Sequence, residues 1–238
     1  MAGLARVTLR DFLAAISGGG VATEPLDSAQ SREAMFDELA AALSERGYAV
    51  IQSALPSRLA SPLQQRVASL DDSAFRPAGV GRQQAYQRDD FVRSDHIRWF
   101  SDSEPSEAGY LAWMEMLRVG INRRLFLGLF DYECHFARYA PGSFYKKHVD
   151  AFRGRSNRVL STVFYLNPQW GSADGGELLI YSGDGQVEAS VKPTMGTLVV
   201  FLSETVPHEV LPAARLRHSI AGWFRVNASL GANIDPPS

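Results

Sequence analysis

Four residues in the second half of the sequence have the types and spacing of a metal site. They are His148, Asp150, His208 and Arg217. Two imidazoles and one carboxylate form the facial triad that holds non-haem Fe(II) and leaves positions open for oxygen chemistry. Arg217 follows the second histidine by nine residues, and its planar cationic fork matches a carboxylate. The pattern therefore predicts an iron centre that uses O2 and a dicarboxylate co-substrate.

The spacing of His148 and Asp150 favours a strand. Residues two apart on a strand point to one face of the sheet, whereas on a helix they do not. The surrounding stretch 143–149 contains Phe, Tyr and Val, which are typical of strands. A histidine two residues from an aspartate is common, so the prediction depends on the addition of His208 and Arg217.

The three other histidines have plainer interpretations. His96 is expected in a loop beside charged residues, and His135 on a strand without an acidic ligand at the required spacing. His218 is expected on the face opposite Arg217. If the strand 216–226 alternates, the mixed set Arg217, Ser219, Ala221 and Trp223 shares a face, which is typical of a ligand pocket.

The composition limits the class of protein. The 238 residues are 45% hydrophobic and 21% charged, which is ordinary for a chain with a real core. A net charge of −2 and a pI of about 6.2 indicate no nucleic-acid partner. The single cysteine, Cys134, excludes an intrachain disulfide and favours a reducing compartment. No apolar run approaches the roughly 20 residues of a membrane helix. We expect a cytoplasmic protein without a membrane partner, and a monomer is favoured.

The first half of the chain predicts helices around one strand. A helix over 31–46 has Ser31 as its expected N-cap and Gly47 as its stop. A strand over 48–51 and two further helices follow, which are expected from Pro56 to about Leu70 and from about Glu104 to Leu127. Residues 1–30 are expected to be a flexible lead. The polar stretch 71–95 is expected to be a long loop, with 76–95 closing over the substrate as a lid.

After Asp131 the hydrophobic period changes to that of strands. Eight short runs are separated by turn signals such as Pro141-Gly142 and Asn167-Pro168. The runs are 132–139, 143–149, 158–166, 177–181, 186–191, 197–202, 207–211 and 216–226. This predicts an α+β fold with a double-stranded β-helix, or jelly roll, as its core over about 131–227. The helices buttress this core, so 31–238 is expected to form a single domain.

Seven motifs carry a resemblance to a known family. They are VRSDHIRW (92–99), YAPG (139–142), YKKHVD (145–150), FYLN (164–167) with Trp170, GGEL (175–178), PHEV (207–210) and RHSIAGW (217–223). In order and spacing, the segment from about Asp89 to Val226 resembles the prolyl hydroxylase branch of the Fe(II)/2-oxoglutarate dioxygenases, especially the oxygen-sensing type and its bacterial relatives. The resemblance covers more than half of the chain.

The resemblance implies a role for each matched residue. It implies that His148, Asp150 and His208 bind iron, and that Arg217 binds the distal carboxylate of 2-oxoglutarate. A further set would complete the co-substrate pocket: Tyr165 as a hydroxyl donor to that carboxylate, Tyr139 and Tyr145 as its lining, and Trp223 beside the metal. Asp95 would pair with Arg158 near the substrate, and Arg82 in the polar loop is a third candidate substrate contact.

The implied activity is hydroxylation of a prolyl residue in a protein or peptide, with 2-oxoglutarate converted to succinate and CO2. The implied cofactors are Fe(II), 2-oxoglutarate and O2, with ascorbate as a candidate accessory. Bacterial relatives of this type act on a translation elongation factor, which makes that partner a candidate. Residues 131–160 hold six basic and three acidic residues, so a basic rim that favours an acidic substrate is a further hypothesis.

Three other functions stay open at the level of sequence. The same scaffold could hydroxylate a free amino acid or another small molecule. A zinc hydrolase also uses two histidines and a carboxylate, but the motifs nominate no general base and leave Arg217 without a purpose. A non-catalytic module that senses 2-oxoglutarate or oxygen is the third. Succinate release separates an oxygenase from a hydrolase, and its dependence on added peptide separates an enzyme from a sensor.

Overall fold

Three long helices cover one face of the molecule in the computed structural model, which describes residues 26, 28–79, 92–151 and 156–227. They are α2 (Ala29–Arg46), α3 (Ser57–Ser69) and α4 (Pro105–Leu125). The apolar face of α2 is buried as its spacing predicts, and Gly47 ends this helix at φ 80° with its N–H bonded to the carbonyl of Leu43. Gly120 lets α4 approach α2, because a Cβ there would lie 2.4 Å from the Phe36 ring.

Seven strands form the major sheet, in the order β1-β9-β6-β11-β4-β3-β2. Their bounds are β1 (Tyr48–Ile51), β9 (Leu198–Leu202), β6 (Arg158–Tyr165), β11 (Arg217–Val226), β4 (Leu129–Tyr139), β3 (His96–Trp99) and β2 (Arg76–Pro77). All these pairs are antiparallel. The long central strand β11 lies between β4 and β6, so side chains from three neighbouring strands share one inner face.

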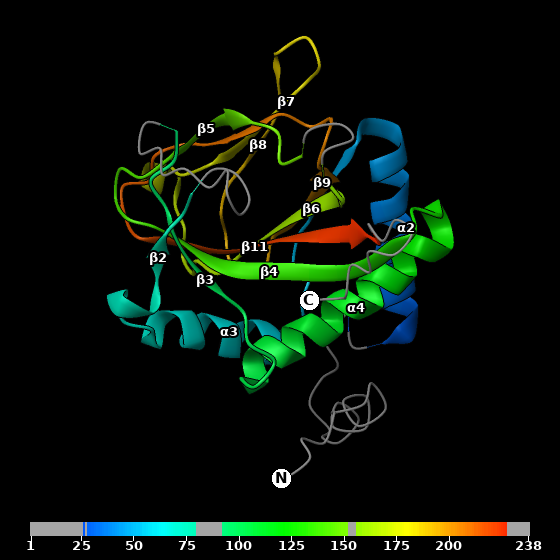
Figure 1. The fold of residues 1–238 in the computed structure, drawn as a ribbon, viewed down its shortest axis with the longest axis horizontal. Coiled ribbons are helices and arrows are strands. Elements are labelled where there is room, and N and C mark those ends of the chain that lie inside the picture. Colours follow the sequence, from blue (N-terminus) through cyan, green and yellow to red (C-terminus); the bar gives the residue numbers. More distant parts are fainter. Residues whose placement is uncertain (1–25, 27, 80–91, 152–155, 228–238) are drawn as a thin grey trace, which may run out of the picture.

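Four short strands form the minor sheet, in the order β5-β10-β7-β8. Their bounds are β5 (Tyr145–His148), β10 (His208–Val210), β7 (Leu178–Tyr181) and β8 (Val187–Val191). Figure 1 shows the minor sheet on one side of the major sheet and helices α3 and α4 along the other side. The eight strands expected from turn spacing are all present, and the predicted jelly roll buttressed by helices is confirmed.

Two apolar clusters reflect this layering. The larger cluster joins the helices to the outer face of the major sheet, with Trp113, Leu117, Phe136 and Phe224 fully or almost fully buried. The smaller cluster lies between the two sheets and includes Tyr165 and Phe201. Burial of these large side chains is the main source of folding free energy. Among the described residues, no helix combines the length and apolarity that crossing a membrane requires.

Three expectations differ from the structure. The N-cap of α2 is Ser28, whose side chain accepts from the N–H of Ser31, so the assignment of Ser31 as the cap was wrong. His96 belongs to β3 rather than to a loop, because it pairs with Arg138 on β4. The polar stretch 71–95 contains a short 3-10 helix (Asp72–Ala74) and β2. Most of the expected lead and the centre of the expected lid, 80–91, lie outside the described residues.

Candidate active site

The three predicted metal ligands meet where β5 and β10 pair. His148 ends β5 and His208 begins β10, and the register places them directly opposite each other. Asp150 follows β5, with its Oδ1 atom 3.4 Å from His148 Nε2 and 3.7 Å from His208 Nε2. One possible donor atom from each residue lies within 4.8 Å of the others. This spacing suits one metal ion held by two imidazoles and a carboxylate.

Backbone carbonyls set the proton position on both imidazoles. His148 Nδ1 lies 2.7 Å from the carbonyl oxygen of Lys146, and His208 Nδ1 lies 3.2 Å from that of Val206. A carbonyl only accepts, so each Nδ1 carries the proton and each Nε2 presents a lone pair to the site. Burial also lowers the pKa of His208 to about 4, which keeps this imidazole neutral at ordinary pH.

The carboxylate of Asp150 is anchored on its far side. Trp223 Nε1 donates to Asp150 Oδ2 at 3.0 Å, which leaves Oδ1 facing the histidines. Burial raises the pKa of Asp150, but the neighbouring His208 and His148 outweigh it and hold that pKa well below its usual range. Asp150 is therefore an anion, which is the form that binds a metal.

Arg217 is a buried cation at the other end of the pocket. Its residue is 1% exposed, and its Nε donates to the carbonyl of Gly176 at 3.0 Å. Its guanidinium carbon lies 4.9 Å and 5.0 Å from the ring centres of Tyr139 and Tyr165. Its Nη2 atom is buried and has no hydrogen-bond partner in the part of the chain that the structure describes. A buried guanidinium with an unsatisfied N–H is costly, and an anionic ligand is the partner that it fits.

The three predicted tyrosines surround the same space in different ways. Tyr139 and Tyr145 line the cavity, and Tyr145 stacks on His148 with ring centres 3.5 Å apart and planes 17° apart. Tyr165 is fully buried beside Arg217, and no described residue forms a hydrogen bond with its hydroxyl. The hydroxyl of Tyr165 and the free N–H of Arg217 are therefore two unsatisfied polar groups close to each other.

One cavity of about 580 Å³ joins the histidines to Arg217. This volume is in the range of small-molecule sites. The four residues expected to share a face of β11, namely Arg217, Ser219, Ala221 and Trp223, all line it. His148 Nε2 is also buried, and it has no hydrogen-bond partner within the described ranges. A metal at the histidines and a small dicarboxylate reaching Arg217 would satisfy these groups, so the residues present fit Fe(II) and 2-oxoglutarate.

The predicted substrate contacts are only partly as expected. The Asp95–Arg158 pair was wrong, because Asp95 is bound by both Nε and Nη2 of Arg93 at 2.7 Å. Arg158 instead donates to Glu133 at 2.7 Å and 2.9 Å. Asp95 and Arg158 therefore each pair with another residue and not with each other. Asp95 and Arg158 do line the cavity, whereas Arg82 lies outside the described residues.

Sequence reasoning missed Arg93, Glu133 and His135 as parts of the site. All three line the cavity. Arg93 lies over the Tyr145 ring at 4.4 Å and so supports the ring that stacks on His148. The spacing Arg93-x-Asp95 was a usable signal, since residues two apart on an extended segment share a face. Burial lowers the pKa of His135 to about 4, and its ring packs between Trp99 and Trp223.

Comparison with known proteins defines the class to which this site belongs. Residues 134–225 match the model of the 2OG-Fe(II) oxygenase superfamily. A solved structure of a Pseudomonas putida prolyl-4-hydroxylase is 40% identical, with a TM-score of 0.74, and the match covers 82% of this chain and 100% of that one. The chain belongs to the 2OG-Fe(II) oxygenase superfamily, in its prolyl hydroxylase branch.

Two animal proteins show the range of this similarity. A Trichoplax adhaerens prolyl hydroxylase, solved in complex with a hypoxia inducible factor oxygen degradation domain peptide fragment, is 27% identical with a TM-score of 0.75. That match covers 85% of this chain and 94% of the other. The Caenorhabditis elegans hypoxia-inducible factor prolyl hydroxylase is 29% identical over 206 residues, which are 76% of this chain. The chain spans between 27% and 56% of the length of the first curated relatives that it matches.

Proposed function

We propose that this protein is an Fe(II)- and 2-oxoglutarate-dependent hydroxylase of a prolyl residue in a protein substrate. His148, Asp150 and His208 would bind the iron, and Arg217 would bind the distal carboxylate of 2-oxoglutarate. Tyr165 would donate its hydroxyl to the same carboxylate, with Tyr139 and Tyr145 lining the pocket and Trp223 flanking the metal.

One observation carries this proposal. Three buried polar atoms, His148 Nε2, the Tyr165 hydroxyl and Arg217 Nη2, have no hydrogen-bond partner among the described residues. Buried polar groups are normally satisfied in folded proteins, so their absence of partners points to ligands. The lone pair of His148 Nε2 suits a metal, and two donors, one of which belongs to a fixed cation, suit a carboxylate. A zinc hydrolase would leave the buried cation and the hydroxyl without a function.

The bound metal and co-substrate would supply the oxidising power, and 2-oxoglutarate would leave as succinate and CO2. The chain supplies position and surroundings. The carbonyls of Lys146 and Val206 hold the imidazole protons on Nδ1, so Nε2 needs no deprotonation before it binds the metal. Arg217 would bind one end of the co-substrate from a buried position.

A prolyl residue in a protein is the substrate class that the relatives support. The Trichoplax hydroxylase was solved with a peptide fragment, and the Pseudomonas protein of 40% identity is a prolyl-4-hydroxylase. In this chain, the cavity reaches Trp99, whose side chain is 49% exposed, so one wall continues to the surface. A translation elongation factor is our specific candidate for the partner.

The basic rim is weaker than the residue count implies. Arg138 pairs with Asp72 at 2.6 Å, and Arg158 pairs with Glu133 at 2.7 Å, so neither adds a full positive charge to the surface. Arg153 and Arg155 lie outside the described residues. The proposal of an acidic substrate therefore depends on Lys146 and Lys147, which are exposed on β5, together with Arg153 and Arg155. Changing Arg153 and Arg155 to glutamate lowers the substrate on-rate if the proposal is correct, and an unchanged on-rate contradicts it.

Three further statements are proposed from the sequence. Residues 31–238 form one dioxygenase domain. The lead predicted at 1–30 is shorter than expected, because Ala29 and Gln30 begin α2, and residues 1–25 and 27 lie outside the described residues. The protein is a monomer. Cys134 as the sole cysteine favours a reducing, cytoplasmic compartment.

Succinate release tests the reaction class. The protein is loaded anaerobically with Fe(II) and 2-oxoglutarate, and succinate is measured after O2 is added, with and without proline-containing peptides and the elongation factor. We expect succinate that rises with the correct substrate and a product that is one oxygen atom heavier at proline by mass spectrometry. Peptide-independent succinate would favour a small-molecule hydroxylase or a sensor.

Two matched variants make this experiment specific. Asp150→Ala removes the metal-binding carboxylate and is expected to abolish succinate release. Glu188→Ala removes an exposed carboxylate from β8 and is expected to leave the rate unchanged. If Asp150→Ala retains the wild-type rate, the proposed metal site is wrong. If wild type releases no succinate with any mixture, the proposed activity is wrong.

A further inference from the structure

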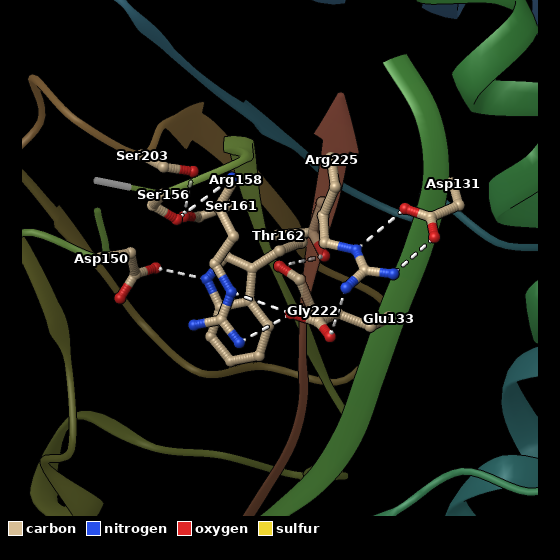
Figure 2. A network of polar contacts seen from close by, with 11 residues as sticks. Asp131, Glu133, Asp150, Ser156, Arg158, Ser161, Thr162, Ser203, Gly222 and Arg225 are labelled. Carbon is tan, nitrogen blue, oxygen red and sulfur yellow. Dashed lines mark hydrogen bonds and ion pairs between the residues drawn. The ribbon is translucent and has the colours of Figure 1, made fainter. Parts of the chain in front are cut away.

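A network of four charged residues lies beside the candidate metal site, on the inner face of the major sheet. The antiparallel register places Glu133 of β4 opposite Trp223 of β11, and Asp131 opposite Arg225. On the other side of β11, Arg225 is opposite Arg158 of β6. Figure 2 shows Arg158 and Arg225 with Glu133 between them, and Asp131 at the outer end of the network.

Each of the two arginines has its own carboxylate in this network. Arg225 Nε donates to Asp131 Oδ1 at 2.9 Å, and its Nη1 reaches Glu133 Oε2 at 3.3 Å. Arg158 donates through Nε and Nη2 to Glu133 Oε1 at 2.9 Å and 2.7 Å. The four side chains are only 10% to 17% exposed. Charge-assisted bonds of this kind hold planar groups in a defined orientation.

Arg158 connects the network to Trp223. The guanidinium carbon of Arg158 lies 3.5 Å from the centre of the Trp223 ring, which is the geometry of a close cation–π contact. Glu133 binds the same guanidinium from its edge, so the guanidinium cannot leave the indole without breaking two hydrogen bonds. The indole is held on one side by Arg158, and the His135 ring lies 5.5 Å away, centre to centre.

Trp223 in turn forms a hydrogen bond with Asp150, which also has a side-chain hydrogen bond with Ser161. Asp150 lies beyond the end of β5, so the strand hydrogen bonds do not orient its carboxylate. The indole N–H donates to Oδ2 at 3.0 Å and so leaves Oδ1 as the atom that faces both imidazoles. Partners behind a ligand commonly fix its orientation and raise metal affinity.

We infer that Glu133 and Arg158 are positioning residues for the metal-binding carboxylate, acting through the Trp223 indole. This inference rests on the metal site proposed above. Glu133 fixes the Arg158 guanidinium, Arg158 fixes the plane of the indole, and the indole fixes the rotation of Asp150. Neither Glu133 nor Arg158 needs to touch the metal for this effect.

Metal affinity in the apo protein tests this inference without turnover. Co(II) serves as a redox-stable probe, and its dissociation constant is measured by calorimetry and by its visible absorption spectrum. Trp223→Phe keeps a ring but removes the N–H, and about tenfold weaker Co(II) binding is expected, in the range for lost partners behind a ligand. Glu133→Gln is expected to weaken binding severalfold and to alter the Co(II) spectrum.

Asp131→Asn is the matched control. It makes the same acid-to-amide change two residues earlier on the same strand, in an ion pair of similar burial. Asp131 binds Arg225, whose Nη1 lies 3.3 Å from Glu133, whereas the guanidinium over the Trp223 ring is that of Arg158. A lower resistance to denaturant with an unchanged Co(II) dissociation constant is therefore expected. If Asp131→Asn weakens Co(II) binding as much as Glu133→Gln does, the effect is general destabilisation and the inference is wrong.

A double variant tests whether Glu133 acts through the indole. If it does, Glu133→Gln adds nothing to Trp223→Phe, and the double variant binds Co(II) as the single Trp223→Phe variant does. Multiplicative weakening would show that Glu133 acts by another route and would refute the inference. An unchanged dissociation constant in Glu133→Gln would also refute it. A wild-type protein that binds no Co(II) would refute the metal site itself.

Discussion

Gly176 offers a direct test of the role proposed for Arg217. Gly176 adopts φ +73°, and a Cβ there would lie 2.9 Å from the Ala213 Cβ and 3.2 Å from the Arg217 Cδ. Ordinary carbon contacts are about 3.5–4.0 Å, so Gly176→Ala must displace these groups by several tenths of an ångström. The same residue also accepts the Nε hydrogen bond of Arg217 through its carbonyl. The substitution therefore moves both the side chain and its anchor.

The expected magnitude has two parts. A left-handed backbone costs alanine about 1–2 kcal/mol, and overpacking costs about 1–3 kcal/mol more, so a loss of about 2–5 kcal/mol in the free energy of unfolding is expected. Displacement of Arg217 is expected to weaken 2-oxoglutarate binding about tenfold, which corresponds to about 1.4 kcal/mol. Calorimetric titration of the Co(II)-loaded protein with 2-oxoglutarate measures the second effect.

Gly128→Ala separates the backbone cost from the contact. Gly128 has a similar φ of +67°, and a Cβ there would meet no atom within 4 Å. It is expected to lose only about 1–2 kcal/mol of stability and none of its 2-oxoglutarate affinity. If the two variants lose equal stability and both bind 2-oxoglutarate as wild type does, the reasoning about Arg217 and its anchor is refuted.

Three further predictions concern acid stability, the metal and a buried amide. Burial lowers the pKa of His135 to about 4, from about 6.5 in an unfolded chain. The unfolded state therefore binds the additional proton at a higher pH than the folded state does. Up to about 3 kcal/mol of stability is lost as pH falls from about 6.5 to about 4. Denaturation of His135→Gln should show a smaller loss over this pH range, and an identical loss would contradict this explanation. His208→Ala is expected to abolish Co(II) binding measured by calorimetry, whereas retained affinity would exclude His208 as a ligand. Asn167 is buried and makes three hydrogen bonds to the backbone of Pro193 and His218. Asn167→Ala is therefore expected to lower the free energy of unfolding by about 2–4 kcal/mol. A loss below about 1 kcal/mol would contradict the contribution assigned to these three hydrogen bonds.

The regular elements were predictable because their signals are local. The apolar spacing that predicts α2 and the turn residues that separate the strands can each be recognised within a short stretch of sequence. Strand β3 was not predicted, because the alternation of His-Ile-Arg-Trp extends over only four residues and follows a polar stretch, and none of the four is buried. Ser28 and Ser31 are equally good caps in sequence. The choice between them depends on where the first helical turn begins.

The meeting of the three candidate metal ligands was predictable because their types and spacing are specific, whereas the partners of charged side chains were not. Asp95 was expected to pair with Arg158, but it pairs with Arg93, which lies two residues away on the same extended segment. Glu133 then binds Arg158 across the sheet. Which of several arginines meets which carboxylate depends on strand register and distances over the whole sheet, and such information is absent from local patterns.

The pairing of His148 with His208 has a consequence for the minor sheet. β5 lies at the edge of that sheet, and its register there rests on two residue pairs with the three-residue strand β10. A metal bound by both histidines would cross-link these strands and close a loop of about 60 residues, which lowers the entropy of the opened state. Metal loading should therefore slow amide hydrogen exchange in β5 and β10 more than in the long strands β4 and β11. The metal would then stabilise the pairing of β5 with β10 as well as supply the reactive centre.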